Sequence, residues 1–421
     1  MHAVRSSLLL LLASLAAPAT AGEPFYLQSN DRVVFYGDSI TDQRLYTTFI
    51  ETYVVTRFPE RNVQFVHSGW GGDRVTGGGG GPIDVRLKRD VFAYRPTVMT
   101  IMLGMNDGSY RAFDESIFKT YANGMDSIVE KVKAELPGIK ITLIQPSPFD
   151  DVTRKPTFEG GYNAVLVRYG DYLKELAEKQ GATLADLNTS VVEATKKAFD
   201  AVGEQATTLN PDRVHPAPGG QLLMAAALLD AWKAPALVSN VQLNVKGEAN
   251  VEVEKLENAK VKDLAQENGG LHWTQRDDSL PFPMDTKDKG IKLALDSSDV
   301  LNQLNRQTLR VKGLESDRFD LKIDGQEVGS FSKQELADGV NLATLSTPMS
   351  KQAAEVHAQT LLHNQIHFVR WRQIQVPLSK LTSPFLDETL ADLDRLEGEI
   401  VAKQRELAQP KEHRFQLTPK G

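Results

Sequence analysis

The fold of this chain is decided near its beginning, by the sequence VVFYGDSIT at residues 33–41. Four apolar residues that favour strands lead into a glycine, an acid and Ser39, and a helix-like segment follows over residues 46–58. This pattern predicts a strand that ends on a tight turn with a serine at its tip, where a nucleophile meets its substrate in an open α/β sheet. Because Thr41 stands where the second glycine of Gly-x-Ser-x-Gly would be, the α/β-hydrolase turn is a poor match. A serine that only caps the next helix is the open alternative.

The alternation of strands and helices continues to about residue 233. Four further apolar runs predict strands at residues 63–66, 98–103, 141–144 and 183–187. The run at 98–103 is almost continuously apolar, which is typical of a strand buried on both faces. We therefore predict an α/β fold, a three-layer α/β/α, flavodoxin-like domain built on a parallel sheet. Ligands of such sheets bind beyond the carboxyl ends of the strands, so the ligand site is expected at the loops after the first three strands.

After Pro235 the pattern changes to the alternation of half-buried strands, and a hairpin is predicted around Asp324-Gly325. Helices are predicted over residues 350–375 and 387–407, the second of them charged and amphipathic. The C-terminal half is thus expected to be a β-rich domain with terminal helices. The expected divisions are residues 1–21 as a signal peptide, 22–238 as the α/β domain, 239–345 as the small β-rich domain and 346–421 as a helical C-terminal region.

The first residues have the pattern of a targeting signal. Arg5 supplies a positive charge, residues 8–15 an apolar core, and Ala19-Thr20-Ala21 a small-residue cleavage site. We expect cleavage after Ala21 and export to the periplasm or the extracellular space, with an uncleaved anchor as the alternative. Nothing later in the chain approaches the roughly 20 apolar residues that span a membrane, so no membrane span is predicted.

Composition excludes several classes of function. A chain of 421 residues exceeds the size that one core usually supports, which favours two or more domains. Its net charge of −7 argues against nucleic acid as the main partner. The absence of cysteine excludes disulfides, thiolate metal sites and a cysteine nucleophile.

Residues that can support serine chemistry lie after the first three predicted strands and just before the last predicted helix of the α/β domain. A serine alcohol needs a base within hydrogen-bond reach, and His215 has a suitable ordinary pKa. Asp212, three residues earlier, can accept from the other ring nitrogen and fix the tautomer. Acyl transfer also needs donors aimed at the developing oxyanion, and the N–H of Ser39, an N–H of the glycine loop at residues 69–73 and the amide of Asn106 can supply them.

These pieces resemble the SGNH (GDSL-type) hydrolase family over about residues 32–233. Gly-Asp-Ser-Ile at 37–40, Gly-Met-Asn-Asp at 104–107 and Asp-Arg-Val-His at 212–215 are similar to the family's nucleophile, asparagine and histidine blocks, in the same order. The resemblance implies that Ser39 is the nucleophile, that Asn106 and a glycine donate to the oxyanion, and that Asp212 and His215 complete the triad.

The glycine of this set has several candidates. The family pattern places it before an acidic or small polar residue, which best matches Gly72 before Asp73, with Gly69 as the next choice and Gly71 also open. Residues around this block are expected to contact substrate, with core packing as the alternative for the tryptophan: Trp70, Asp73, Arg74 and Tyr110.

His363 and His367 are spaced as in a helical zinc-protease motif, but Gln365 replaces the glutamate that acts there as base. Helix packing or an interface is the preferred interpretation, and we predict neither a metal nor an organic cofactor. The charged helix at 387–407 is expected to be a solvated face, with dimerisation as an alternative.

The sequence as a whole predicts an exported serine ester hydrolase that removes short acyl groups, most of all acetyl groups, from carbohydrate esters. Its expected partner is a small-molecule or polysaccharide ester. The alternatives are a lipid-directed esterase or lysophospholipase of the same fold, and a non-catalytic carbohydrate-binding or scaffold protein. The acyl chain, the alcohol, the role of residues 239–421 and the oligomeric state are left open.

Overall fold

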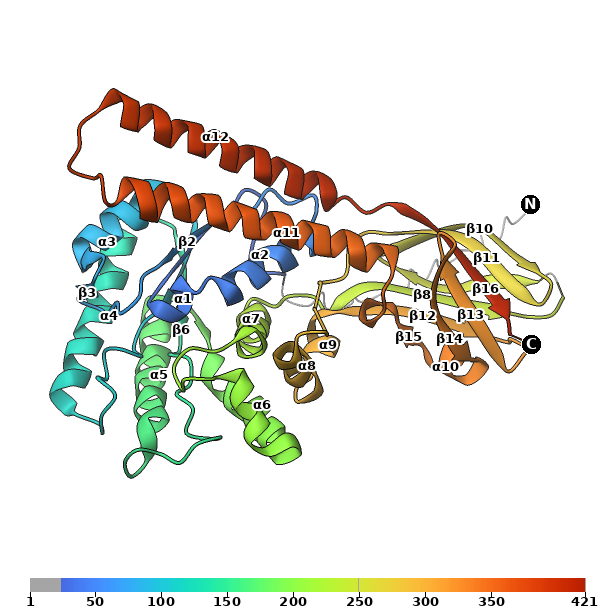
Figure 1. Cartoon of the computed structure of the whole chain (residues 1–421), viewed down its shortest axis with the longest axis horizontal. Coiled ribbons are helices and arrows are strands. Elements are labelled where there is room, and N and C mark those ends of the chain that lie inside the picture. The colour runs from blue at the N-terminus through green and yellow to red at the C-terminus, as the bar shows by residue number, and fades with distance from the viewer. Residues whose placement is uncertain (1–23, 249, 421) are drawn as a thin grey trace, which may run out of the picture.

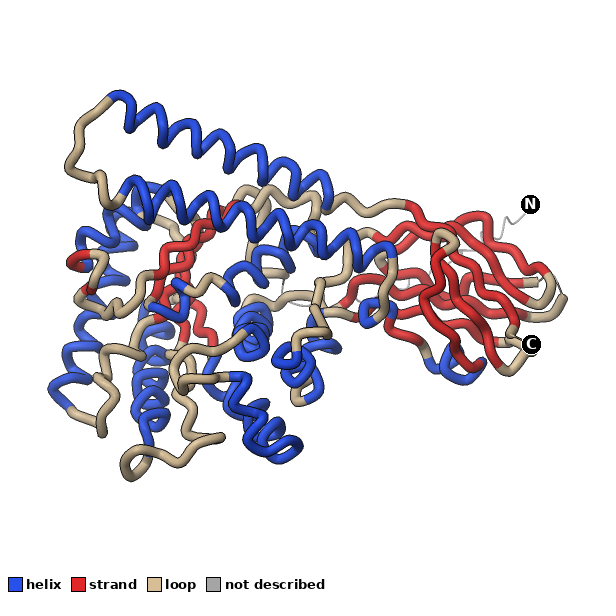
Figure 2. Tube along the Cα trace, in the orientation of Figure 1, coloured by secondary structure: helices blue, strands red, loops and turns tan. Residues whose placement is uncertain are grey.

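The structure, a computed structural model, describes residues 24–248 and 250–420, so the predicted signal peptide lies outside the described residues. An α/β body occupies one end of the molecule and a group of strands the other (Figure 1). Figure 2 shows the strands gathered in these two places, one enclosed by helices and one at the far end. A long pair of C-terminal helices runs back from the far end over the α/β body.

The α/β body contains the predicted parallel sheet of five strands. In chain order they are β1 Arg32–Gly37, β2 Gln64–Gly69, β5 Val98–Met102, β6 Lys140–Ile144 and β7 Thr183–Ala185. Their order in the sheet is β2-β1-β5-β6-β7, and every pairing is parallel. All five residues of β5 are buried, as its continuous apolar run predicts. The predicted α/β fold is confirmed.

Helices cover both faces of this sheet (Figure 1). They are α1 Ser39–Asp42, α2 Leu45–Arg57, α3 Ile83–Asp90, α4 Glu115–Glu135, α5 Gly161–Gln180, α6 Leu187–Val202 and α7 Pro218–Ala231, with short 3-10 turns at Phe92–Tyr94 and Gly203–Leu209 and a two-residue ribbon of β3 Gly77–Gly78 and β4 Gly81–Pro82. Local sequence sets several of their starts. Asp114 and Asp186 accept hydrogen bonds from the first free N–H groups of α4 and α6, and Pro218 occupies the first turn of α7.

The strands of the C-terminal half form two sheets. They are β8 Leu237–Val245, β9 Val251–Glu257, β10 Ala259–Glu267, β11 Gly270–Asp277, β12 Arg306–Lys312, β13 Arg318–Ile323, β14 Gln326–Ser332, β15 Val340–Asn341 and β16 Glu412–Pro419. One sheet has the order β10-β11-β16-β13-β14 and the other β15-β12-β8-β9. The predicted hairpin joins β13 to β14, and its turn residues Asp324 and Gly325 both have the positive φ that a primed turn requires.

The division of the C-terminal half differs from the prediction in two respects. The region expected to be β-rich also contains α8 Lys289–Asp296, α9 Val300–Leu304, α10 Lys333–Asp338 and a 3-10 turn at Leu342–Thr344. The region expected to be helical contains α11 Pro348–Phe368, a π-helical segment Val369–Gln375 and α12 Pro384–Leu407, but it ends in β16. Because β16 lies between β11 and β13, the end of the chain completes the sheet that begins at residue 259.

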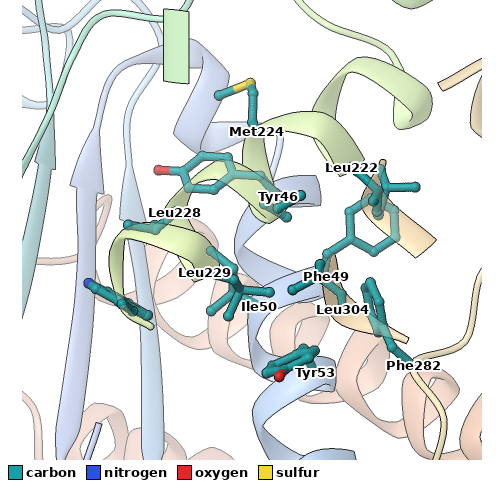
Figure 3. Close-up of a cluster of buried hydrophobic side chains, with 14 of the residues drawn as sticks. Tyr46, Phe49, Ile50, Tyr53, Leu222, Met224, Leu228, Leu229, Phe282 and Leu304 are labelled. Atoms are coloured by element: carbon teal, nitrogen blue, oxygen red, sulfur yellow. The ribbon is translucent and has the colours of Figure 1, made fainter. Parts of the chain in front are cut away.

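The two halves of the molecule share one hydrophobic core. Figure 3 shows Tyr46, Phe49, Ile50 and Tyr53 of α2 packed against leucines of α7 and against Phe282 and Leu304 of the C-terminal half. The ring of Phe282 lies edge-on to Phe49 and Tyr53, with centroids 6.1 and 5.9 Å apart. Residues 235–239 are therefore not a flexible linker between independent domains, since packed side chains bridge the boundary.

Helix α2 is enclosed because α11 covers the side that the sheet and α7 leave open. All of its residues except Leu45 are buried, including Glu51. The Glu51 carboxylate accepts hydrogen bonds from His363 of α11 at 2.7 Å, Gln404 of α12 at 2.9 Å and His67 of β2 at 3.2 Å. Its charge is thus compensated mainly by residues more than 300 positions away.

Candidate active site

Three side chains from two distant parts of the sequence meet beyond the carboxyl end of β1. The Oγ of Ser39 lies 2.8 Å from Nε2 of His215, and Nδ1 of His215 lies 2.7 Å from Oδ2 of Asp212. The other oxygen of Asp212 accepts the backbone N–H groups of Val214 and His215. Partial burial alone raises the pKa of Asp212, but these bonds outweigh it and hold the pKa below its usual value. The arrangement has the geometry of a serine–histidine–aspartate triad.

The turn that presents Ser39 is tightly packed. Asp38 accepts the N–H of Ile40 at 3.0 Å and so caps α1, and burial raises the pKa of its carboxyl to about 7. A Cβ on Gly37 would lie 2.2 Å from Oγ1 of Thr41, so only glycine fits at the strand end. Thr41, the residue that breaks the Gly-x-Ser-x-Gly pattern, is buried and shares a hydrogen bond with the hydroxyl of Tyr46.

The glycine loop (residues 69–73) passes beside Ser39. Trp70 donates its backbone N–H to the carbonyl of Gly37, and Gly71 donates its backbone N–H to Oδ2 of Asp42 at 3.1 Å. A Cβ on Gly71 would come within 4.0 Å of the Cβ of Ser39. Gly72 has a φ of +78° and faces open space, and it is exposed. Since Asp42 already takes the N–H of Gly71, Gly72 is the better placed of the two to donate to a ligand.

Asn106 follows β5 and lies on the same edge of the sheet. Its amide nitrogen donates to the carbonyl of Asp73 at 3.0 Å, and its amide oxygen accepts the hydroxyl of Tyr110 at 3.0 Å. Both ends of the amide are therefore held, and one of its two N–H bonds is left for a ligand. The next residue, Asp107, is buried and accepts the N–H of Val75, and burial raises its pKa to about 6.

Two of the four residues expected to contact substrate are instead buried. Asp73 has no exposed surface, and its carboxylate pairs with the guanidinium of Arg86 at 2.7 Å. Trp70 is 9% exposed and packs edge-on against Trp371, with ring centroids 5.7 Å apart. The physical reason is that Arg86, which is itself fully buried, needs counter-charges and aromatic faces around it. The buried side chains of Trp70 and Asp73 thus anchor the glycine loop, to which both residues belong, to the interior.

The other two residues of that set are exposed: Arg74 directly follows the glycine loop, and Tyr110 contacts Asn106. Tyr110 is 43% exposed, and its hydroxyl orients Asn106. Their position leaves both free to meet a substrate at the rim of the site.

Sequence reasoning missed the contribution of the C-terminal half to this region. Trp371 donates its indole N–H to Asp90 at 2.6 Å, and Arg372 lies over the ring of Trp70. The only local signal was a run of aromatic and basic residues, Phe-Val-Arg-Trp-Arg at 368–372, near the end of the first predicted C-terminal helix. Nothing in that run says which surface it packs against.

The histidine pair of α11 lies elsewhere, in the interior beside β2. His363 is bonded to Glu51 at 2.7 Å and to Glu397 of α12 at 3.1 Å, and His367 lies 3.6 Å from Glu397. Burial alone lowers the pKa of His363, but the two carboxylates outweigh it and raise the pKa to about 10. Across residues 24–248 and 250–420, no group of three or more acidic or histidine side chains has the arrangement of a metal site. The pair joins helices, as the preferred interpretation expects.

Comparison with known proteins identifies the class of the α/β body. The profile of the GDSL-like lipase/acylhydrolase family matches residues 35–223. An acetylxylan esterase from Geobacillus stearothermophilus is 25% identical over 223 residues, which make up 48% of this chain and 93% of that protein. Over residues 35–223 the chain belongs to the GDSL-like lipase/acylhydrolase (SGNH) family of carboxylic ester hydrolases, as its motifs predict.

One solved structure extends the likeness of fold to nearly the whole chain. A gut microbial diltiazem-metabolizing enzyme has a TM-score of 0.80 and 23% identity, and the match covers 94% of this chain and 98% of that one. The crystal structure of Axe2, an acetylxylan esterase from Geobacillus stearothermophilus, has a TM-score of 0.41 and 23% identity, and covers 50% of this chain and 97% of that one. The first match shows that the C-terminal sheets and helices are part of a fold that a second protein shares.

Proposed function

We propose that this protein is an exported serine esterase that removes short acyl groups, most of all acetyl groups, from carbohydrate esters. The observation that carries the proposal is the continuous hydrogen-bond chain from Ser39 through His215 to Asp212, with both distances below 3 Å. A serine that only capped a helix would need no imidazole at its hydroxyl. The nucleophile is thus paired with its base, as activation of a serine alcohol requires.

The proposed reaction follows from this geometry. The Oγ of Ser39 attacks the ester carbonyl while Nε2 of His215 takes its proton, and Asp212 stabilises the imidazolium that forms. The oxyanion is held by the N–H of Ser39, the N–H of Gly72 and the free N–H of the Asn106 amide. His215 then returns the proton to the leaving alcohol, and a water molecule, activated by the same imidazole, releases the acid and restores the serine.

The choice of substrate rests on separate support. An acetylxylan esterase is a distant relative of the α/β body, and this similarity supports an acetyl ester of a carbohydrate as the substrate. The exposed rim residues, Arg74 and Tyr110, offer a guanidinium and a phenol, groups that can hydrogen-bond to hydroxyl-rich substrates. In residues 24–248 and 250–420, no helix is long and apolar enough to cross a membrane. Export is proposed on the pattern of residues 1–21 alone.

The test is hydrolysis of p-nitrophenyl acetate, butyrate and decanoate and release of acetate from acetylated xylo-oligosaccharides. Wild type is compared with Ser39→Ala and with Ser190→Ala, a control serine exposed on α6. We expect acetate esters to be preferred and kcat to fall by several orders of magnitude in Ser39→Ala alone. A preference for decanoate would replace the carbohydrate substrate with a lipid, whereas turnover that survives in Ser39→Ala would reject the mechanism. Export is tested by sequencing the mature N-terminus, which we expect to be Gly22.

A further inference from the structure

A segment of the C-terminal half lies against the glycine loop. This segment, Val369–Gln375, is π-helical and continues directly from α11. Arg372 places its guanidinium carbon 3.0 Å from the centre of the Trp70 ring, and Trp371 meets the same ring edge-on at 5.7 Å. Single π-helical turns occur often at functional sites, and here the turn directs two neighbouring side chains to one indole.

Arg372 is also connected to the nucleophile turn. Its Nη2 lies 3.9 Å from Oδ2 of Asp42, the last residue of the short helix that begins with Ser39. That same oxygen accepts the N–H of Gly71 at 3.1 Å. Arg372 therefore reaches the glycine loop by two routes, through the ring of Trp70 and through the carboxylate of Asp42.

Both contacts act on the part of the glycine loop that lies beside Ser39 and contains Gly71 and Gly72. Gly71 lies between Trp70 and Gly72, and a Cβ on it would come within 4.0 Å of the Cβ of Ser39. A shift of Trp70 or Asp42 would therefore move the loop relative to Ser39. Glycines have no side chain to anchor them, so the position of this loop depends on its neighbours.

The last residue of α11 makes a further contact near Asp42. Phe368 lies beneath the guanidinium of Arg44, whose carbon is 4.1 Å from the ring centre, and Nε of Arg44 donates to the carbonyl of Asp42 at 3.3 Å. Arg44 holds a left-handed conformation with a φ of +61°. Such strain persists only where surrounding contacts fix it, and Phe368 supplies one of them.

Partial burial of the Arg372 guanidinium has a cost in free energy. Its Nη1 atom is buried and has no hydrogen-bond partner among the described residues. Burial lowers the pKa of Arg372, and the charge of Asp42 opposes this. A guanidinium over an indole is stabilised by the ring's electrons, and a planar group stacks there better than an ammonium would.

We propose that Arg372 is a positioning residue of the hydrolytic site, which holds the glycine loop beside Ser39 by stacking on Trp70 and by pairing with Asp42. The C-terminal half thereby completes the site of the α/β body. The inference rests on the proposed ester hydrolysis. Because the loop donates to the oxyanion and not to the resting ester, removing Arg372 lowers kcat and leaves KM nearly unchanged.

The experiment compares Arg372→Met, Arg372→Lys and Asp42→Asn with the double variant that combines the first and third. Arg370→Met is the matched control, because Arg370 lies on the same segment but pairs with Asp394 of α12 at 2.7 Å. For each variant kcat and KM are measured on p-nitrophenyl acetate, and Tm is measured in parallel. The rate of labelling of Ser39 by a fluorophosphonate gives a second readout. In that reaction an O–P bond to Ser39 forms as the P–F bond breaks, fluoride leaves, and His215 takes the serine proton.

We expect Arg372→Met to lose about 10- to 100-fold in kcat and in labelling rate, with KM within about twofold of wild type. Arg372→Lys keeps a charge near Asp42 but loses the planar stack, so its loss is intermediate. The double variant is expected to lose less than the product of its single losses, since both act on one loop. Arg370→Met keeps both rates within about twofold.

Two results would overturn the inference. One is an Arg372→Met enzyme with normal kcat and labelling rate, and the other is an equal loss in Arg370→Met, which would mean that any damage to the segment suffices. A wild-type protein that neither turns over esters nor labels at Ser39 would reject the proposed function itself. A wild type that does both, beside an unaffected Arg372→Met, would reject only the role of Arg372.

Discussion

The buried pair of Glu51 and His363 offers the sharpest test of how the two halves are held together. Glu51 is 1% exposed and His363 is 3% exposed, and Nδ1 of His363 lies 2.7 Å from Oε1 of Glu51. In His363→Leu the carboxylate stays in the interior with only the neutral donors of His67 and Gln404. Removing one partner of a buried ion pair costs about 3–5 kcal/mol. For a chain of 421 residues this corresponds to a fall in Tm of roughly 3–6 °C.

The pH dependence of this loss has a definite sign. The pKa of His363 is raised to about 10 in the folded protein, above the value of 6.5 that a free histidine has. Its contribution to stability is therefore fully present below pH 6.5 and is lost as the pH rises through about 10. The pKa of Glu397 is lowered to about 2, so its contribution is present above pH 4.5 and is lost as the pH falls. The difference between wild type and His363→Leu is thus greatest between about pH 4.5 and 6.5.

The assay is urea unfolding of both proteins, followed by circular dichroism at pH 5.5, 7.5 and 9.5. The matched control is His272→Leu, because the side chain of His272 is 42% exposed and its Nδ1 lies 4.0 Å from Oε2 of Glu267 in a surface pair. Exposed pairs of this kind contribute about 0–1 kcal/mol, so the control should change little at any pH. A loss below 1 kcal/mol in His363→Leu at pH 5.5, or a loss that grows toward pH 9.5, would refute the reasoning.

Three further predictions concern the site and its supports. Asp212→Asn should keep the fold but lower kcat about 10⁴-fold in ester hydrolysis, because the amide favours the wrong tautomer of the histidine. Gly37→Ala should destabilise the protein by about 1–3 kcal/mol in urea unfolding, because the added Cβ would lie 2.2 Å from Oγ1 of Thr41. Its control is Gly398→Ala on the exposed face of α12, where the added Cβ meets open space and should stabilise the protein by up to about 1 kcal/mol. Arg86→Met should cost about 3–5 kcal/mol, since Asp73 would lose its counter-charge, and a normal Tm would contradict this.

Much of the candidate site could be predicted because its parts are local. Each block is a few residues that end a strand or begin a helix, and parallel strands bring their carboxyl ends to one edge of a sheet. Ser39 and Asn106, which follow β1 and β5, are therefore expected at one edge of the sheet, and the family resemblance assigns the Asp212–His215 turn to the same site. The structure brings these three blocks together, with Ser39 and His215 in direct contact.

The end of the chain shows where pattern reading fell short although a signal was present. His413, Phe415 and Leu417 alternate with exposed residues, which is the pattern of a half-buried strand. Because helices precede these residues, the whole of residues 346–421 was predicted to be helical. The partners of β16 are β11 and β13, about 100 to 150 residues earlier, so its pairing could not be inferred from neighbours.

The parallel sheet, the family and the residues that can carry out ester chemistry are predictable from the sequence, because periodicity and short motifs report what each segment does locally. Three other features are set by tertiary packing: Trp70 and Asp73 face inward, Glu51 pairs with His363, and Arg372 lies on the glycine loop. Each of these depends on which face of one element meets another far along the chain. A buried charge must find a counter-charge somewhere, but the sequence does not say where, since that choice is made by the packing of the whole molecule.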